Sequence, residues 1–373
     1  MNAVFRQSCV RYVLRTRLSD YISLRPYFEI YLTTSQAPSH ACAALKILHF
    51  SMSSAPAPLT VAQKDHFHKH GYIVLHDCFT REQAAEATKD VWIRLGMSPD
   101  DKSTWTVNKV NMPMHNEFDS AAFAPKAWAA ICELCGGKDR VAEKGRKWRD
   151  SFIVNLGTPE GEGKVVPPKE LDAWHVDGDF FVHYLDSPEQ ALLVVPLFSD
   201  IVKDGGGTMI CPEAIPIVAK HLYDHPEGVS PKMSTRADPN FKTVDYKVGV
   251  NWYNELAKSC DEFVEVTGKV GDVYLLHPLM LHSATHNALR NIRIITNPPV
   301  SLKSPFCFDR EDGDYSLVER KTMDCIGGQE KLKGWKITMP REGVSPKLWE
   351  AKEIQKREEV RRLEEARRVS ASA

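Results

Sequence analysis

Two histidines and one aspartate in this sequence have side chains that can bind a metal ion. His175 and Asp177 stand two positions apart in "LDAWHVDGDFFVHYLD" (residues 171–186), which we interpret as a half-buried strand. Because successive side chains of a strand alternate between its faces, both would point to the same side and hold one ion. A further imidazole would complete the two-histidine, one-carboxylate set of non-haem Fe(II) sites, which leaves coordination positions open for other ligands.

The second histidine must come from another strand. The segment "GDVYLLHPLMLHSATHN" supplies His277, His282 and His286. In a regular strand, only one of His277 and His282 can face the same side as the other ligands, because an odd number of positions separates them. The other histidine would lie at the surface or behind the ligands, and spacing alone leaves the choice between the two open.

Arg293 lies in the apolar stretch "NIRIITNPPV". An unpaired guanidinium is costly among apolar side chains, so we expect it to have an anionic partner. If it projects into the same cavity, its planar fork can bind the distal carboxylate of 2-oxoglutarate through two hydrogen bonds. The alternatives are a guanidinium that reaches the surface or one that pairs with an internal Asp or Glu.

Together these motifs resemble the phytanoyl-CoA dioxygenase-like group of Fe(II)/2-oxoglutarate oxygenases. The resemblance covers about residues 59–300 and includes "HVD", "GGGTMICP", "GDVYLLHPLMLH", a basic residue eleven positions after His282, and the opening "LTVAQKDHFHKHGYIVLHDCFT". It implies that His175, Asp177 and His282 bind iron and that Arg293 binds the keto acid. It also implies a reaction: oxidation, usually hydroxylation, of a small organic or lipid-like substrate, with Fe(II), 2-oxoglutarate and O2, releasing succinate and CO2.

The sequence departs from the family pattern at two places. Val176 stands where the family often has Gln, and "PEAI" (Pro212–Ile215) replaces a "PGSH"-like ending. Neither change removes a metal ligand, but both weaken the expectation that a coenzyme A thioester is the substrate. Two rival functions remain open: a zinc hydrolase that uses the same donors, and a catalytically inactive barrel that acts as a binding protein.

The pattern of apolar runs predicts a mainly β fold with flanking helices. From residue 151 onwards, short apolar runs alternate with turn residues, which favours antiparallel strands in a sandwich or barrel. Combined with the family resemblance, this predicts a double-stranded β-helix, a jelly-roll barrel of the cupin kind. Helices are expected at the capping-box patterns "TVAQ" (60–63) and "TREQ" (80–83) and over about 121–135, with a strand in "GYIVLHDCF".

We expect three segments along the chain. Residues 1–51 are rich in Arg, Ser and Thr and poor in acids, like a targeting segment; residues 52–345 form the dioxygenase-like domain; residues 346–373 form a charged, solvated helix with pairs such as Glu358–Arg362. Nine scattered cysteines indicate reduced thiols. We therefore predict an intracellular protein that is cytoplasmic, or mitochondrial if residues 1–51 are a transit peptide.

Several other features have a structural interpretation that we prefer. A formal net charge of −1 gives no reason to expect nucleic acid, and no apolar run is long enough for a membrane span. We expect a small-molecule substrate, while the sequence does not indicate the oligomeric state. Cys132 and Cys135 fit a buried helix face, Asn155 a buried amide bonded to backbone, and residues 205–207 a tight turn. His183 would line the pocket only if the strand continued through "DGD".

Overall fold

The computed structural model describes residues 59–239, 241, 251–345 and 348–372. The chain divides into two units, Met1–Ser53 and Ser54–Ala373, and the described residues all belong to the second. The predicted extension at residues 1–51 and its targeting role therefore lie outside the described residues.

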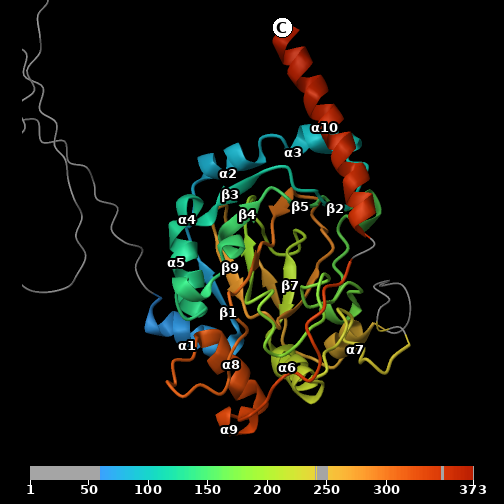
Figure 1. Ribbon diagram of the computed structural model, residues 1–373. Helices are drawn as coiled ribbons and strands as arrows, with labels where there is room; N and C mark the ends of the chain where they lie inside the picture. Colours follow the sequence, from blue (N-terminus) through green and yellow to red (C-terminus); the bar gives the residue numbers. More distant parts are fainter. Residues whose placement is uncertain (1–58, 240, 242–250, 346–347, 373) are drawn as a thin grey trace, which may run out of the picture. The chain divides into compact units, whose positions relative to one another are not determined.

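Antiparallel strands occupy the centre of this unit, with helices around them (Figure 1). The sheets have the strand orders β1-β9-β6-β12, β10-β7-β8, β11-β5-β2 and β3-β4. The strands are β1 (Tyr72–Leu75), β2 (Lys109–Asn111), β3 (Glu117–Asp119), β4 (Lys147–Arg149), β5 (Ile153–Asn155), β6 (Leu192–Pro196), β7 (Thr208–Cys211), β8 (Val264–Val266), β9 (Val273–Leu276), β10 (Leu281–Ala284), β11 (Arg293–Ile295) and β12 (Pro299–Val300).

The expected succession of antiparallel strands is confirmed, but the closed barrel is not. Within the described residues the strands form separate sheets, and single bridges, such as Leu197 with Ile295 of β11 and Gly205 with Asn287, add isolated links between segments. One continuous apolar core nevertheless runs through the sheets and the helices that cover them. The double-stranded β-helix therefore stays a prediction, while the antiparallel sheets with flanking helices are observed.

Helices flank the strands (Figure 1). They are α1 (Val61–His70), α2 (Arg81–Thr88), α3 (Val91–Leu95), α4 (Ser120–Phe123), α5 (Pro125–Leu134), α6 (Ile215–Asp224), α7 (Trp252–Lys258), α8 (Leu317–Ile326), α9 (Gln329–Leu332) and α10 (Leu348–Ser372). No helix in the described part of the chain is both long enough and apolar enough to cross a membrane.

Local sequence signals explain where several helices begin and end. Both predicted capping boxes form: Thr60 and Thr80 each accept a hydrogen bond from the backbone of the residue three positions on, and the Gln there bonds back. The helix expected over about 121–135 is present but divided at Ala124, because Pro125 starts α5 as its first residue. Cys135 follows α5 as its C-cap and is buried, as expected for a structural cysteine.

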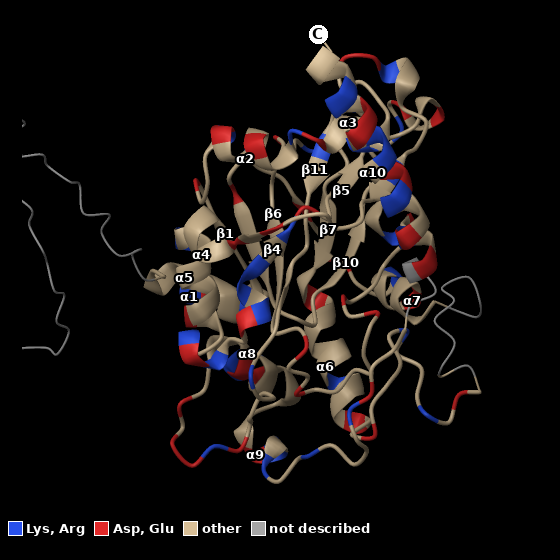
Figure 2. Cartoon of the chain, turned by 45° about the horizontal axis from the view of Figure 1, so that its top comes forward, with Lys and Arg blue, Asp and Glu red and all other residues tan. Residues whose placement is uncertain are grey.

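The C-terminal helix is exposed along most of its length, but it also makes a buried contact that we did not predict. Acidic and basic residues do alternate along α10 (Figure 2). However, Glu359 is only 1% exposed and lies 2.8 Å from the Nε of Arg94, which is itself 2% exposed. The predicted Glu358–Arg362 pair is absent: Arg362 donates to the carbonyl of Arg94, and Glu358 pairs with Arg361. The helix is therefore attached to the domain by buried charges.

Candidate metal centre

A short backbone bridge brings the two candidate histidine ligands together. The N–H of His175 donates to the carbonyl of His282 at 2.9 Å, and the N–H of His282 donates to the carbonyl of His175 at the same distance. Residues that exchange both bonds in an antiparallel pair project their side chains to the same side. The imidazole rings accordingly lie with their centroids 4.2 Å apart.

The segment that carries His175 is not the regular strand that we predicted. Between residues 171 and 186, only His175, Phe181 and His183 form isolated bridges, and Gly178 has a φ of 119°. His175 and Asp177 nevertheless face a common point. This arrangement comes from the single bridge to β10 and the turn that follows Asp177, because strand alternation does not extend through the segment.

Three donor atoms converge at this point. Oδ1 of Asp177 lies 3.3 Å from Nε2 of His175 and 3.4 Å from Nε2 of His282. Each of the three side chains offers one ligand atom, and all these atoms lie within 4.8 Å of one another. In the part of the chain that the structure describes, no other group of three His, Cys, Asp or Glu side chains is arranged in this way.

Hydrogen bonds to the backbone set the tautomer of both rings in their neutral form. Nδ1 of His175 lies 2.8 Å from the carbonyl of Ala173, and Nδ1 of His282 lies 3.0 Å from the carbonyl of Met280. A carbonyl only accepts, so each Nδ1 carries the proton and each Nε2 keeps its lone pair. Neutral imidazoles oriented by such bonds are what a metal ion requires. The three side chains therefore fit a divalent metal ion of the first transition row.

The ionisable ligands also shift each other's pKa values. Burial lowers the pKa of His175, but the hydrogen bond and charge of Asp177 outweigh it, so the net shift is upward. Burial raises the pKa of Asp177, but the charge of His282 and the hydrogen bonds of both imidazoles hold it well below its usual range. The carboxylate is therefore ionised and available as a ligand at neutral pH.

Arg293 is buried and has no acidic partner among the residues that the structure describes. Its side chain is 1% exposed, and its NH2 donates to the hydroxyl of Thr208 at 2.7 Å. No Asp or Glu pairs with it among the described residues, and its Nε is buried with no hydrogen-bond partner. Burial lowers the pKa of this guanidinium to about 9. The two alternatives, a guanidinium at the surface and one paired with an internal carboxylate, are thus both excluded for the described part of the chain.

A second cation lies beside Arg293, and sequence reasoning missed it. In the sheet β11-β5-β2, Arg293 is opposite Asn155, and Asn155 is opposite Lys109, so the three side chains share one face. Desolvation and the charge of Arg293 lower the pKa of Lys109, and Lys109 in turn acts on the pKa of His175. Nothing in the sequence of β2, a three-residue strand, predicted this neighbour. Asn155 bonds backbone carbonyls, as expected.

His277 has a structural role that differs from both alternatives that we considered. It is fully buried, lying neither at the surface nor behind the metal ligands, and its Nε2 lies 3.0 Å from the hydroxyl of Thr322 in α8. Its Nδ1 accepts the N–H of Leu279 at 3.2 Å. The regular strand assumed for residues 277–282 does not exist, because β9 ends at Leu276 and a turn separates it from β10.

Other residues near the ligands support the local chain. His183 is buried and its Nε2 lies 2.7 Å from the carbonyl of Gly178, so it stabilises the turn after Asp177, and burial lowers its pKa to about 4. Trp174 is a core residue whose indole donates to the carbonyl of Pro168. Asn297, which the sequence did not indicate, donates to Oδ2 of Asp177 at 3.1 Å.

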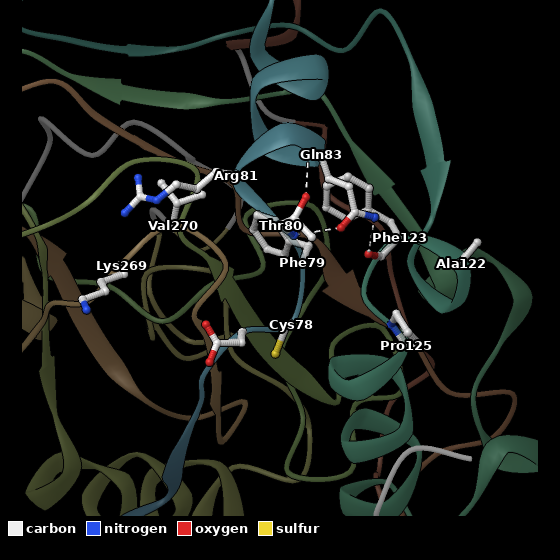
Figure 3. A pocket seen from close by; sticks show the side chains of 11 residues that line it. Cys78, Phe79, Thr80, Arg81, Gln83, Ala122, Phe123, Pro125, Lys269 and Val270 are labelled. Atoms are coloured by element: carbon white, nitrogen blue, oxygen red, sulfur yellow. Dashed lines mark hydrogen bonds between the residues drawn. The ribbon is translucent and has the colours of Figure 1, made fainter. Parts of the chain in front are cut away.

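A surface hollow of about 530 Å³ lies at the start of α2, away from these ligands (Figure 3). None of the three candidate metal ligands lines it. Two of its polar side chains are engaged: Gln83 donates to the carbonyl of Phe123, and Arg81 pairs with Asp200 at 2.8 Å. The hollow is therefore separate from the candidate metal centre.

Comparisons with known proteins give structural neighbours only. The chain matches no known family and no curated protein. The epimerase SnoN, in complex with Fe3+, alpha-ketoglutarate and nogalamycin RO, is 15% identical over 64% of this chain and 82% of its own, with a TM-score of 0.34. HygX from Streptomyces hygroscopicus, with nickel, 2-oxoglutarate and hygromycin B bound, is 13% identical over 66% and 88%, with a TM-score of 0.35.

A hypothetical protein from Escherichia coli, JW0805, is 11% identical over 65% of this chain and 68% of its own, with a TM-score of 0.38. Similarity at this level leaves the activity to be argued from the residues of this chain. The resemblance to the phytanoyl-CoA dioxygenase-like group stays a prediction.

Proposed function

We propose that this protein is a non-haem Fe(II)/2-oxoglutarate-dependent oxygenase. In this proposal His175, Asp177 and His282 bind the iron, and Arg293 binds the distal carboxylate of 2-oxoglutarate. One observation carries the proposal: a converging set of two imidazoles and one carboxylate occurs together with a buried guanidinium that has no acidic partner among the described residues. A hydrolytic zinc site would account for the first feature but gives no role to the second.

The positions along β7 support the idea that one small molecule could contact both the candidate metal centre and Arg293. Arg293 donates to Thr208, and Ile210, two positions further along β7, is opposite His282 in β10. Two residues of a strand span about 7 Å, which is comparable to the length of a five-carbon diacid. Lys109, on the same face as Arg293, adds a second positive charge for such an anion.

Iron, when bound with 2-oxoglutarate and dioxygen, supplies the oxidation of the substrate, with release of succinate and CO2. The chain contributes orientation and charge. The carbonyls of residues 173 and 280 place the proton of each neutral imidazole on Nδ1, which leaves Nε2 for the metal ion, and Asp177 supplies a negative charge that stays ionised. Without keto acid, the buried charge of Arg293 is unfavourable because it has no anionic partner. Binding of the keto acid supplies that partner through a salt bridge. Hydroxylation of a small organic substrate is the outcome that we propose.

An anaerobic titration tests this function directly. Adding Fe(II) and then 2-oxoglutarate to the purified protein should produce the visible charge-transfer absorption of a chelated keto acid. The variant His282→Ala should lose the band, while His277→Asn, which changes a buried histidine outside the site, should retain it once circular dichroism shows that it is folded. Absence of the band in the unmodified protein would contradict the proposed function.

A further inference from the structure

The two oxygens of Asp177 have different surroundings. Oδ1 faces Nε2 of both His175 and His282, at 3.3 and 3.4 Å. Oδ2 accepts a hydrogen bond from the side-chain amide of Asn297 at 3.1 Å. One oxygen therefore lies among the donor atoms of the candidate metal centre, and the other is already bonded to a residue outside it.

The backbone around Asn297 is restrained on both sides, which fixes the point from which its side chain reaches Asp177. β11 ends two residues before it, and the hydroxyl of Thr296 lies within 3.5 Å of backbone carbonyls of residues 149 and 151. Pro298 and Pro299 follow, and proline fixes φ. Pro299 and Val300 then pair with β6. Asn297 thus lies on a short rigid connection that begins at the strand of Arg293.

A carboxylate can bind a metal ion through one oxygen or through both. If Asp177 used both, two imidazoles and two oxygens would occupy four positions of a six-coordinate ion, which leaves too few for a chelating keto acid and dioxygen. We propose that Asn297 is a positioning residue that restricts Asp177 to a single metal-bound oxygen and so keeps three coordination positions open. This inference rests on the proposed function, because that function requires the three open positions.

The test counts the water molecules on Mn(II) bound to the protein alone, without keto acid. Line broadening of the Mn(II) electron paramagnetic resonance signal in oxygen-17-enriched water gives this number. The unmodified protein should hold three waters. Asn297→Leu, which keeps the size of the side chain but removes its donor, should hold two, because Oδ2 of Asp177 becomes free to bind the metal.

Asn254→Leu is the matched control. Asn254 donates to the carbonyl of Asp172 and accepts the N–H of Trp174, so it supports the same segment without touching the Asp177 carboxylate. This variant should hold three waters, whereas a purely structural effect on the segment would alter both variants alike.

Three waters in Asn297→Leu, or two in the unmodified protein, would overturn the proposal; the second measurement does not depend on whether any variant folds. The outcome is separable from that of the proposed function. A protein that holds three waters and loses one in Asn297→Leu, yet shows no keto-acid band, contradicts the function and leaves the role of Asn297 intact. A normal band with unchanged water counts contradicts only the role of Asn297.

Discussion

At the scale of single residues, protons and metal ions compete for the same nitrogen atoms. The net effect of Asp177 is to raise the pKa of His175 above its ordinary value of 6.5, so without metal this imidazole keeps its proton to a higher pH than a free histidine would. Only a neutral imidazole binds a metal ion. Asp177 itself stays ionised over this range, because its pKa is held well below the usual value.

We therefore expect metal affinity to fall as the pH drops, with a midpoint above 6.5, the ordinary pKa of histidine. Measuring the Mn(II) dissociation constant over a pH series at fixed ionic strength checks this. Metal affinity decreases towards low pH because His175 becomes protonated as the pH falls through its raised pKa. A midpoint at or below 6.5 would show that Asp177 does not favour protonation of His175 in the metal-free protein.

Arg293 should affect stability and co-substrate binding in opposite directions. A charge-assisted hydrogen bond contributes about 1.5–3 kcal/mol, so Arg293→Met should weaken 2-oxoglutarate binding by about one to two orders of magnitude while leaving Mn(II) affinity unchanged. Without keto acid, the same variant should be as stable as the parent protein or more so, because it removes a buried, incompletely bonded charge. Calorimetric titration and urea unfolding measure the two effects. Unchanged keto-acid binding would exclude Arg293 as the clamp.

At the scale of elements, local patterns were predictable and long-range pairing was not. The capping boxes at Thr60 and Thr80 formed as expected, because they depend on residues three positions apart. His175 and Asp177 were expected together for the wrong reason: strand alternation fails in residues 171–186, and a single bridge to His282 replaces it. That bridge joins positions more than a hundred residues apart, and no short-range signal encodes it.

The same limit applies to two other residues. The burial of Glu359 depends on Arg94, far away in the chain, so the mixed charges of α10 were consistent with a solvated helix. Asn297 follows a recognisable buried strand, but its bond to Asp177 depends on how the two segments approach each other. Residue types were therefore enough to name the candidate metal ligands, while the residues that orient them required the fold.

The attachment of α10 gives a prediction at this scale. Removing one partner of a buried ion pair costs about 3–5 kcal/mol, and Arg94 keeps Asp150 as a second partner at 3.2 Å. Glu359→Ala should therefore lower the free energy of unfolding by about 3 kcal/mol, at the low end of that range. Glu358→Ala, on the exposed side of the same helix, should change it by less than about 0.5 kcal/mol. Equal effects of the two changes would show that the buried pair does not anchor the helix.

At the scale of the whole molecule, buried neutral histidines couple folding to pH. Burial lowers the pKa of His277 to about 3 and that of His183 to about 4, from an ordinary value of 6.5. The unfolded chain therefore binds protons that the folded chain does not, and the stabilisation is fully present above pH 6.5 and lost as the pH falls below it. His175, with its raised pKa, acts in the opposite sense in the metal-free protein.

The free energy of unfolding should thus decrease on acidification below about pH 6.5, by at most about 1.4 kcal/mol per pH unit for each of the two histidines. The slope measures the number of protons that the chain takes up on unfolding, and His277→Asn should lower this number by about one. The variant should also be less stable at neutral pH, because it loses the bond to Thr322. Urea unfolding at a series of pH values between 4 and 7 gives the slope as well as the stability. Loss of a hydrogen bond lowers the stability at every pH, whereas loss of a buried neutral histidine changes the slope. A variant that is less stable at every pH but keeps the parent slope would show that His277 is not buried in its neutral form.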